Sequence, residues 1–311
     1  MTEAELAALA EEIVGRVVER KPGRGTAGRR HGGTAAQTHA EVDRVVPSRR
    51  AAVPLSRLST GLHRVADLVD HTLLKAEATR ADIEKLCVEA AEHGFAAVCV
   101  NPTWVELCVE RLAGTQVAVA TVVGFPLGAT TSRAKSAEAR EAVAAGADEI
   151  DMVAAIGRVK GGEWGYVEDD IRAVVEASRP AIVKVIIESA VLTPEDIVKA
   201  SVISKEAGAH FVKTSTGFHA AGGATPAAVR LMRLAVGDDL GVKAAGGVRD
   251  CASALAMVAA GANRLGTSSG VGFVTCLGPG PISFRELLAD PQAHAHVCTS
   301  GTCRPAGGAA Y

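Results

Sequence analysis

The sequence predicts an α/β protein, a (β/α)8 TIM barrel with an N-terminal extension that is part helical and part disordered. Between about residues 55 and 285, short apolar runs alternate with longer helical patterns. Such alternation favours a parallel sheet whose strands are joined by helices. Eight units within about 220 residues favour a closed barrel, although the count alone does not exclude an open doubly wound sheet.

The predicted elements follow one another in a regular order. Strands are expected at 66–70, 96–100, 116–123, 149–153, 181–187, 210–213, 241–245 and 263–266. Helices are expected at 80–93, 103–112, 132–145, 168–178, 193–207, 225–236 and 250–260. Two helices begin with Thr-Pro, at Thr193 and Thr225, which pairs a capping hydroxyl with proline at the first helical position. Three helices end in Ala-Gly-Ala, where glycine suits the left-handed residue that closes a helix.

Composition limits the function classes. The 311 residues are 48% hydrophobic and carry a net charge of −2, which provides no general attraction to nucleic acid or to an anionic membrane. Seven scattered cysteines without metal-type spacing are typical of a reduced, intracellular protein. The first residues do not resemble a signal peptide, and no apolar run reaches about 18 residues. We therefore expect a cytoplasmic protein with neither nucleic-acid nor membrane partners.

The two ends differ in composition from the barrel region, predicted at 51–290. Residues 2–20 place apolar side chains at helical spacing, so residues 1–50 are expected to hold an amphipathic helix followed by a flexible basic linker. A nucleic-acid-binding arm is the less favoured alternative for that linker. Residues 291–311 are predicted to be disordered. Their histidines and cysteines match no zinc pattern, so we predict no metal and no cofactor; these are His294, His296, Cys298 and Cys303.

Charged residues stand at the ends of several predicted strands. Lys213 is the last residue of the sixth predicted strand. Taken alone, it would be interpreted as an ordinary lysine at a strand end whose ammonium group reaches solvent. Lys184 and Lys243 lie on the neighbouring strands, and Asp151 lies on the fourth. Neighbouring ammonium groups repel one another, so one amine can be neutral near pH 7, as a Schiff-base nucleophile requires. An internal ion-pair network without chemistry is the alternative.

Glycine-rich turns follow the seventh and eighth strands. They contain Gly246-Gly247 and Gly266-Thr-Ser-Ser-Gly270. In barrels of this type, phosphate sites commonly form from these two loops, because backbone N–H groups and hydroxyls can approach the anion. Tight structural turns are the equally weighted alternative.

Seven sequence blocks resemble the deoxyribose-phosphate aldolase family, in the same order and spacing over roughly residues 55–285. They are DHTLL (70–74), VGFPLG (123–128), EIDMV (149–153), KVIIE (184–188), FVKTSTGF (211–218), KAAGGVR (243–249) and RLGTSS (264–269). The resemblance implies a class I aldolase on a (β/α)8 barrel. Its expected reaction is reversible cleavage of 2-deoxy-D-ribose 5-phosphate to D-glyceraldehyde 3-phosphate and acetaldehyde.

The resemblance also implies residue roles. Lys213 resembles the Schiff-base lysine, Lys243 the lysine that lowers its pKa, and Asp151 the acid/base residue. Further positions are expected to line the substrate pocket or its phosphate end: Asp70, Thr72, Cys99, Lys184, Thr214, Gly246, Gly247, Gly266, Ser268 and Ser269. One departure follows Gly217, where some relatives carry a basic residue and this chain has Phe218 and then His219.

Three functions remain in competition at this point. The leading one is the aldolase named above, with a sugar phosphate as substrate and a homo-oligomer, such as a dimer, as the assembly. A related Schiff-base aldolase or transaldolase acting on another sugar phosphate is the second. The third, from a different class, is a non-catalytic barrel that senses a sugar phosphate or serves as a scaffold.

Overall fold

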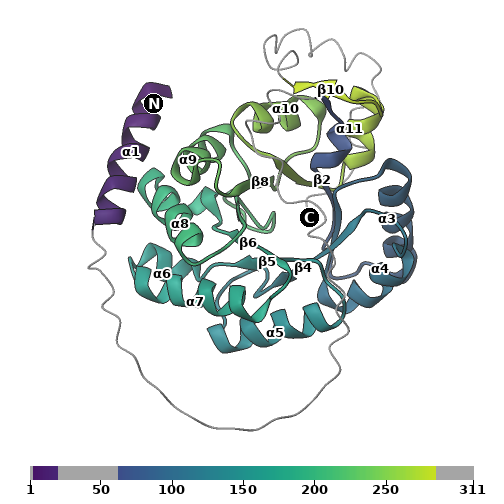
Figure 1. The fold of residues 1–311 in the computed structure, drawn as a ribbon, viewed down its shortest axis with the longest axis horizontal. Coiled ribbons are helices and arrows are strands. Elements are labelled where there is room, and N and C mark those ends of the chain that lie inside the picture. Colours follow the sequence, from purple (N-terminus) through teal and green to yellow (C-terminus); the bar gives the residue numbers. More distant parts are fainter. Residues whose placement is uncertain (1–2, 20–61, 285–311) are drawn as a thin grey trace.

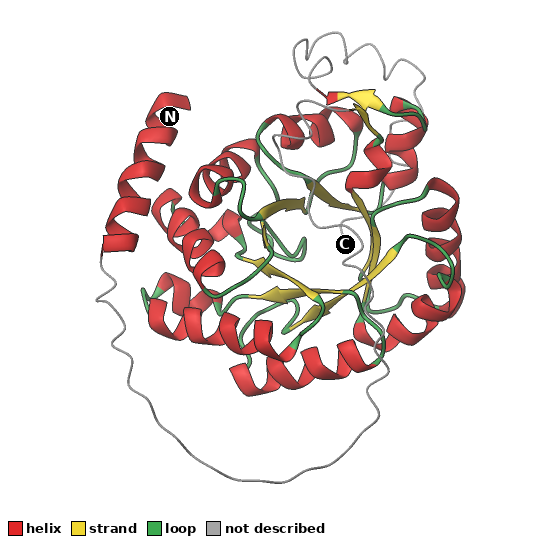
Figure 2. Cartoon of the chain, viewed as in Figure 1, coloured by secondary structure: helices red, strands yellow, loops and turns green. Residues whose placement is uncertain are grey.

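The computed structural model describes residues 3–19 and 62–284. Eight parallel strands close into a barrel in the order β2-β3-β4-β5-β6-β7-β8-β9, and helices surround it (Figures 1 and 2). The predicted (β/α)8 barrel is therefore confirmed. The strands are β2 Val69–Leu73, β3 Ala97–Val100, β4 Ala118–Val123, β5 Glu149–Val153, β6 Ile182–Ile186, β7 Phe211–Lys213, β8 Gly241–Ala245 and β9 Arg264–Thr267.

The helices cover the outside of the barrel. They are α3 Arg80–His93, α4 Val105–Arg111, α5 Ser132–Ala144, α6 Ile156–Lys160, α7 Trp164–Ala177, α8 Pro194–Glu206, α9 Pro226–Val236, α10 Cys251–Ala259 and α11 Gly270–Leu277. Short 3-10 turns stand at η1 Val65–Leu68, η2 Pro102–Trp104 and η3 Ser189–Val191. The hydroxyls of Thr193 and Thr225 accept hydrogen bonds from the first turns of α8 and α9, so both predicted caps are confirmed.

Three features of the fold differ from the expected elements. The first strand begins at Val69 rather than at residue 66, because Val65–Leu68 forms a 3-10 turn whose apolar side chains are buried. Helix α7 begins at Trp164, four residues before the expected start. The sequence pattern also did not predict α11 or the antiparallel pair of β1 Leu62–His63 and β10 Ile282–Ser283. Short apolar runs do not distinguish a helical turn from a strand, which explains the first difference.

The expected N-terminal helix is present as α1 Glu3–Glu19. It packs against α8 and α9, at the left of Figure 1, and it buries Ala10 and Ile13. Its apolar stripe is thus covered by the outer helices of the same barrel. The predicted linker up to residue 50 and the predicted tail at 291–311, with its histidines and cysteines, lie outside the described residues.

The barrel interior is divided into an apolar half and an ionic half. Inward-facing residues of β3 and β4 form a small apolar cluster with Leu74: Ala97, Cys99, Ala118, Ala120 and Val122. Their sequence neighbours, such as Val98 and Val119, belong to the main core beneath the helices, as the two-residue period of a strand requires. Across the barrel, the inward positions of β2 and of β5 to β9 carry charged side chains instead.

Candidate active site

One carboxylate gathers three lysines at the centre of the barrel. Asp151 Oδ2 lies 2.7 Å from the Nζ of Lys213 and 2.7 Å from the Nζ of Lys243, while its Oδ1 lies 2.8 Å from the Nζ of Lys184. All four side chains are buried. The four residues expected to converge from strands β5, β6, β7 and β8 are therefore brought together.

Strand register explains the convergence. Asp151 pairs in register with Lys184 on β6, and Lys213 pairs with Lys243 on β8. Residues that share a level on adjacent parallel strands and point inward meet inside the barrel. Lys213 is the last residue of β7, so its amine lies toward the carboxyl end of the barrel, where active sites of this fold are built.

A second group of charges continues this cluster. Asp70 contacts Lys243 at 2.5 Å and Arg264 at 2.7 Å, and it lies 3.3 Å from Lys184. Glu149 contacts Lys184 at 2.5 Å and Arg264 at 3.2 Å. We did not predict Arg264 or Glu149 as site residues. The two-residue period of a strand could have indicated that Glu149 faces inward, because it lies two residues before Asp151 on β5.

The lysines hold Asp151 ionised. Burial acts to raise the pKa of this carboxyl group, but the ammonium groups of Lys184, Lys213 and Lys243 together hold the pKa well below its usual range. Asp151 is therefore a carboxylate over the whole range in which the protein would work. It can accept hydrogen bonds from the lysines and from water or a hydroxyl group of a bound molecule.

Lys213 is shifted in the direction that nucleophilic chemistry requires. Burial lowers the pKa of its amine, and the neighbouring Lys243 lowers it further, whereas Asp151 opposes the shift only in part. Lys184 and Lys243 behave in the opposite way, because their contacts with Asp151 and Asp70 overcome the effect of burial and raise the pKa of each above its usual value. The pKa of Lys213 is thus lowered while the pKa values of the other two lysines are raised, so Lys213 is the lysine that loses its proton most readily.

Cys99 and Thr72 are uncharged residues on β3 and β2. Cys99 belongs to the apolar half of the barrel, and burial together with the charge of Asp151 raises the pKa of its thiol, which stays protonated. The hydroxyl of Thr72 donates to the backbone oxygen of Asp70 at 2.8 Å. Asp70 itself is fully buried among Lys184, Lys243 and Arg264, so it belongs to the charge cluster.

The segment after Lys213 is fastened to neighbouring strands. Thr214 Oγ1 donates to the oxygen of Ala245 and accepts from the nitrogen of Ala245, both at 3.0 Å, which ties the ends of β7 and β8 together. Ser215 is fully buried, and its hydroxyl has no hydrogen-bond partner. A buried hydroxyl without a partner, two residues beyond the key lysine, is suited to a polar group of a ligand.

Glu188 supports this segment and was not predicted as a site residue. It has a left-handed backbone, with φ of 52°, which costs about 1–2 kcal/mol for a residue other than glycine. Its carboxylate accepts from Thr216 Oγ1 at 2.5 Å and from the Thr216 nitrogen at 3.3 Å. A strained and buried glutamate that binds the loop beyond Lys213 indicates a positioning role.

Replacing Glu188 with glutamine should therefore weaken activity without removing it. We expect turnover to fall about tenfold and the free energy of unfolding to fall by about 1–3 kcal/mol, because a charged acceptor is lost. The measurement is steady-state kinetics together with urea unfolding. The matched control is Glu106→Gln, an exposed glutamate far from the barrel centre. Equal kinetics for the two variants would show that Glu188 does not act on the site.

The glycines of the two predicted phosphate turns have different surroundings. Gly246 and Gly247 have φ of 82° and 79°, a conformation that favours glycine, and Gly247 is exposed. A Cβ on Gly266 would lie 3.0 Å from Lys243 Cε, so this glycine makes room for the buried lysine. Ser268 is exposed and Ser269 is half-buried, at the start of α11. Backbone and hydroxyl donors are thus available beyond β8 and β9.

The position that departs from the family pattern is apolar. Phe218 packs edge-on against Phe125 with ring centroids 5.2 Å apart, which brings together the loops after β7 and β4. His219 is exposed, and its Nδ1 accepts a hydrogen bond from the Ala221 nitrogen.

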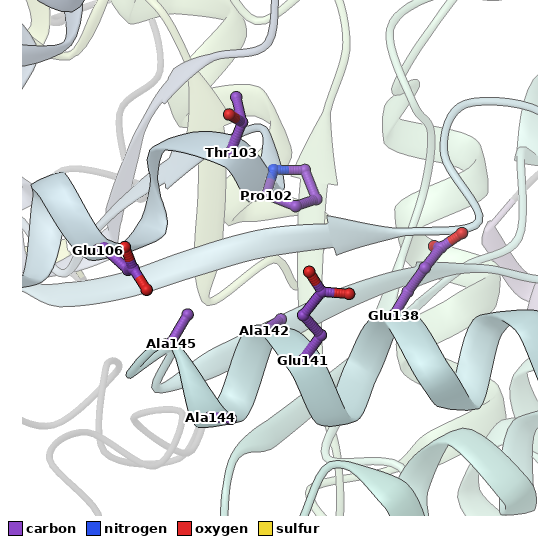
Figure 3. Close-up of a pocket in the computed structure, with 8 residues that line it drawn as sticks. All are labelled: Pro102, Thr103, Glu106, Glu138, Glu141, Ala142, Ala144 and Ala145. Carbon is purple, nitrogen blue, oxygen red and sulfur yellow. The ribbon is translucent and has the colours of Figure 1, made fainter.

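A separate cavity of about 580 Å³ lies on the outside of the barrel (Figure 3). It lies between the segment Pro102–Glu106 and α5, and its lining includes Glu106, Glu138 and Glu141. Glu138 also accepts a hydrogen bond from the Gly124 nitrogen at 2.7 Å. None of the residues that form the lysine cluster lines this cavity, so it is distinct from the barrel centre.

The fold and the cluster define a class: a (β/α)8 barrel whose centre holds a buried amine with a lowered pKa, an ionised carboxylate and two further lysines. Such a centre is equipped for proton transfer and for amine chemistry on carbonyl compounds. The family model of the DeoC/LacD aldolases matches residues 64–275, and the chain belongs to this family.

Relatives that carry a more specific name are similar along the same region. A deoxyribose-phosphate aldolase of Streptococcus pneumoniae serotype 19F (strain G54) is 60% identical over 203 residues, which cover 65% of this chain and 92% of the relative. One from Geobacillus sp. (strain WCH70) is 56% identical over 213 residues, covering 68% and 95%. The solved structure of a tetrameric deoxyribose phosphate aldolase from Aeropyrum pernix is 33% identical with a TM-score of 0.63, covering 68% and 90%.

Proposed function

We propose that this chain is a class I aldolase that reversibly cleaves 2-deoxy-D-ribose 5-phosphate to D-glyceraldehyde 3-phosphate and acetaldehyde. The reaction would run through a Schiff base on Lys213 and would serve the catabolism of deoxyribose phosphates in the cytoplasm. The observation that carries the proposal is the arrangement of Lys213, a buried lysine with a lowered pKa, 2.7 Å from a carboxylate that also binds Lys243. The names of the relatives supply the substrate.

The first chemical step is imine formation. The neutral amine of Lys213 adds to the C1 aldehyde of the open-chain sugar, and loss of water together with uptake of one proton from solvent leaves a protonated imine. This cation forms on the nitrogen that lies 2.7 Å from Asp151, so the carboxylate can stabilise it at contact distance. Lys243 stays protonated throughout, because Asp70 and Asp151 both stabilise its charge.

The second step breaks the carbon–carbon bond. Asp151, directly or through a water molecule, accepts the proton of the C3 hydroxyl, and the C3 oxygen forms the new carbonyl group. The electron pair of the C2–C3 bond moves into the imine and gives an enamine, while glyceraldehyde 3-phosphate leaves. The proton that Asp151 accepted returns to the enamine carbon and restores the protonated imine, and water then releases acetaldehyde, the neutral amine of Lys213 and one proton to solvent.

The phosphate end of the substrate would lie at the turns after β8 and β9. Backbone N–H groups near Gly246 and Gly247 and the hydroxyls of Ser268 and Ser269 are the candidate donors. Ser215, whose buried hydroxyl has no partner, is a further donor on the same side of the barrel. Since Phe218 stands where some relatives have a basic residue, these neutral donors would supply most of the phosphate affinity.

The proposal also covers the assembly and the surroundings of the protein. Among residues 3–19 and 62–284, no helix has the length and apolar content needed to span a bilayer. The Aeropyrum pernix relative is tetrameric. We propose a homo-oligomer here as well, and the mass in solution, measured by light scattering, is the direct test.

A coupled assay for glyceraldehyde 3-phosphate tests the proposed reaction. With 2-deoxyribose 5-phosphate as substrate, we expect turnover, and we expect kcat/KM to exceed that for unphosphorylated deoxyribose by about 10²-fold or more. Two hydrogen bonds to a charged phosphate, at roughly 1.5–3 kcal/mol each, account for such a ratio. Equal rates on the two sugars would contradict the phosphate site. A complete lack of turnover, with the sugar phosphate still bound, would favour a sensor.

A further inference from the structure

Arg264 lies within the buried charge cluster although no step of the proposed reaction uses it. Its guanidinium group on β9 lies 2.7 Å from Asp70 Oδ1 and 3.2 Å from each carboxylate oxygen of Glu149. Only 2% of the residue is exposed. A guanidinium group cannot lose its proton in a protein, so Arg264 places a permanent positive charge inside the barrel.

The charges of the cluster do not balance. Among the described residues, three carboxylates and four cationic side chains form it: Asp70, Glu149 and Asp151 against Lys184, Lys213, Lys243 and Arg264. A surplus positive charge in a buried site is costly, and loss of a proton from one lysine removes it. Since arginine cannot supply that proton, one of the three lysines must.

The contacts identify which lysine is neutral. Lys184 lies within ion-pair distance of Asp70, Glu149 and Asp151, and Lys243 within ion-pair distance of Asp70 and Asp151. Lys213 has an ion pair with Asp151 alone among the described residues. Its ammonium form is therefore the least compensated of the three, and its proton is the first to leave.

We propose that Arg264 is a positioning residue that keeps Lys213 in its neutral, nucleophilic form by supplying the fourth positive charge of the cluster. Arg264 acts through Asp70 and Glu149, whose negative charge would otherwise be available to the lysines. This inference rests on the proposed function, in which Lys213 attacks a carbonyl group. It adds a residue whose effect is electrostatic and whose contacts are with carboxylates rather than with substrate.

The other groups around Lys213 do not remove the surplus. Cys99, from β3, has a thiol that stays protonated, because burial and the charge of Asp151 raise its pKa. Burial lowers the pKa of His210, at the start of the β7 segment, and its Nδ1 accepts a hydrogen bond from the Val183 nitrogen, so it is a neutral ring near pH 7. The carboxylate of Glu188, on the loop after β6, is engaged by Thr216. The other charged groups of the cluster, among residues 3–19 and 62–284, are the three carboxylates, Lys184, Lys243 and Arg264 already counted.

The test measures how the reactivity of Lys213 depends on pH. Wild-type protein and variants are incubated with acetaldehyde and borohydride over a pH series, and the rate of adduct formation at Lys213 is followed by peptide mass spectrometry. In wild type, the rate rises through the pKa of Lys213 and then levels off. The midpoint of that rise reports the charge state of this lysine in each variant.

The variants change the charge count one unit at a time. Arg264→Met leaves three cations against three carboxylates, and we expect its midpoint to move by about one pH unit or more to higher pH, which makes trapping about tenfold slower below the midpoint. Glu149→Gln leaves four against two, and its midpoint should move to lower pH. The double variant Arg264→Met/Glu149→Gln leaves three against two, so its midpoint should return toward that of wild type.

Two further variants guard against a purely structural explanation. Arg264→Lys keeps the charge, so its midpoint should stay near that of wild type. Lys135→Met/Asp170→Asn removes a fully buried ion pair of 2.6 Å between α5 and α7, outside the barrel, and should leave the midpoint unmoved. If Arg264→Met does not fold, Glu149→Gln and the double variant still give different expectations. The first should have a lower midpoint than wild type, and the second, which removes both charges of the Arg264–Glu149 pair, should have a midpoint near that of wild type.

The outcomes separate the two proposals. No adduct at Lys213 in the wild-type protein overturns the proposed function. An adduct at Lys213 whose midpoint is the same in wild type, Arg264→Met and Glu149→Gln overturns only the role of Arg264. The same holds if the double variant stays at the midpoint of Arg264→Met, because the effect would then not follow the charge count.

Discussion

Replacing Lys213 with alanine is expected to reduce kcat/KM for 2-deoxyribose 5-phosphate by about 10⁴-fold or more. The proposed reaction proceeds through a covalent bond to this amine, and no other described lysine combines a lowered pKa with a place at the end of a barrel strand. Loss of a covalent nucleophile typically removes several orders of magnitude of rate. The fold should survive, because Asp151 keeps its contacts with Lys184 and Lys243.

The assay is paired with chemical trapping. Wild-type protein treated with acetaldehyde and borohydride should gain one adduct, and the modified peptide should contain Lys213. Lys199→Ala is the control, since this lysine lies on α8 and pairs with Glu195 outside the barrel. Normal turnover by Lys213→Ala, or an adduct on a different lysine, would refute the assignment of the nucleophile.

Replacing Asp151 with asparagine should affect both activity and stability. The carboxylate is the shared partner of three buried lysines, and its loss removes one compensating charge from the ammonium groups of Lys184 and Lys243. Breaking a buried ion pair by removing one partner typically costs about 3–5 kcal/mol in the free energy of unfolding. Loss of the acid/base group should also lower turnover by about 10²–10⁴-fold.

The dependence of the free energy of unfolding on pH below about pH 4 gives an independent measurement for the same variant. The folded pKa of Asp151 is lower than its unfolded value of about 3.9, so its stabilising contribution is full above that pH and is lost as the pH falls toward the folded pKa. Wild type should therefore lose stability below about pH 4 more steeply than Asp151→Asn. Urea unfolding at pH 7 and across the acid range measures both effects.

The control for Asp151→Asn is Asp170→Asn. Asp170 is also fully buried and also binds a buried lysine, at 2.6 Å, but the pair joins α5 and α7 on the outside of the barrel. Its replacement should cost stability and leave turnover of the folded fraction within about threefold of wild type, since it touches no group of the proposed chemistry. Equal losses of activity in the two variants would mean that Asp151 acts only through stability.

Local sequence signals predicted the elements whose boundaries depend on local chemistry. Helix α3 was expected at 80–93 and runs from Arg80 to His93, because Thr79 and Asp82 form a capping box and Gly94 closes the helix with a left-handed φ of 63°. The start of β2 was predicted too early, since Val65–Leu68 is an apolar run whose helical turn is decided by packing. Local patterns carry no information about such packing.

The same division applies to the site. Lys213, Lys243, Lys184 and Asp151 could be selected from the sequence, because they are charged residues in apolar strands and lie in blocks that resemble an aldolase family. Arg264 and Glu149 were not predicted: the two-residue period of a strand indicates that they face inward, but their contact depends on the register of β9 across the barrel from β5. The contacts of Thr214 with Ala245 and the space that Gly266 leaves for Lys243 likewise depend on neighbouring strands.

The sequence by itself determined the alternation of strands and helices, because alternation and capping are local properties of the chain, and its resemblance to an aldolase family supplied the closed barrel and the expected roles of the lysines and the aspartate. Only the tertiary structure decided which lysine is least compensated. That property depends on distances among seven charges from β2, β5, β6, β7, β8 and β9, which closure of the barrel brings together. Electrostatic energy varies with distance and burial, and neither quantity is written in the order of the residues.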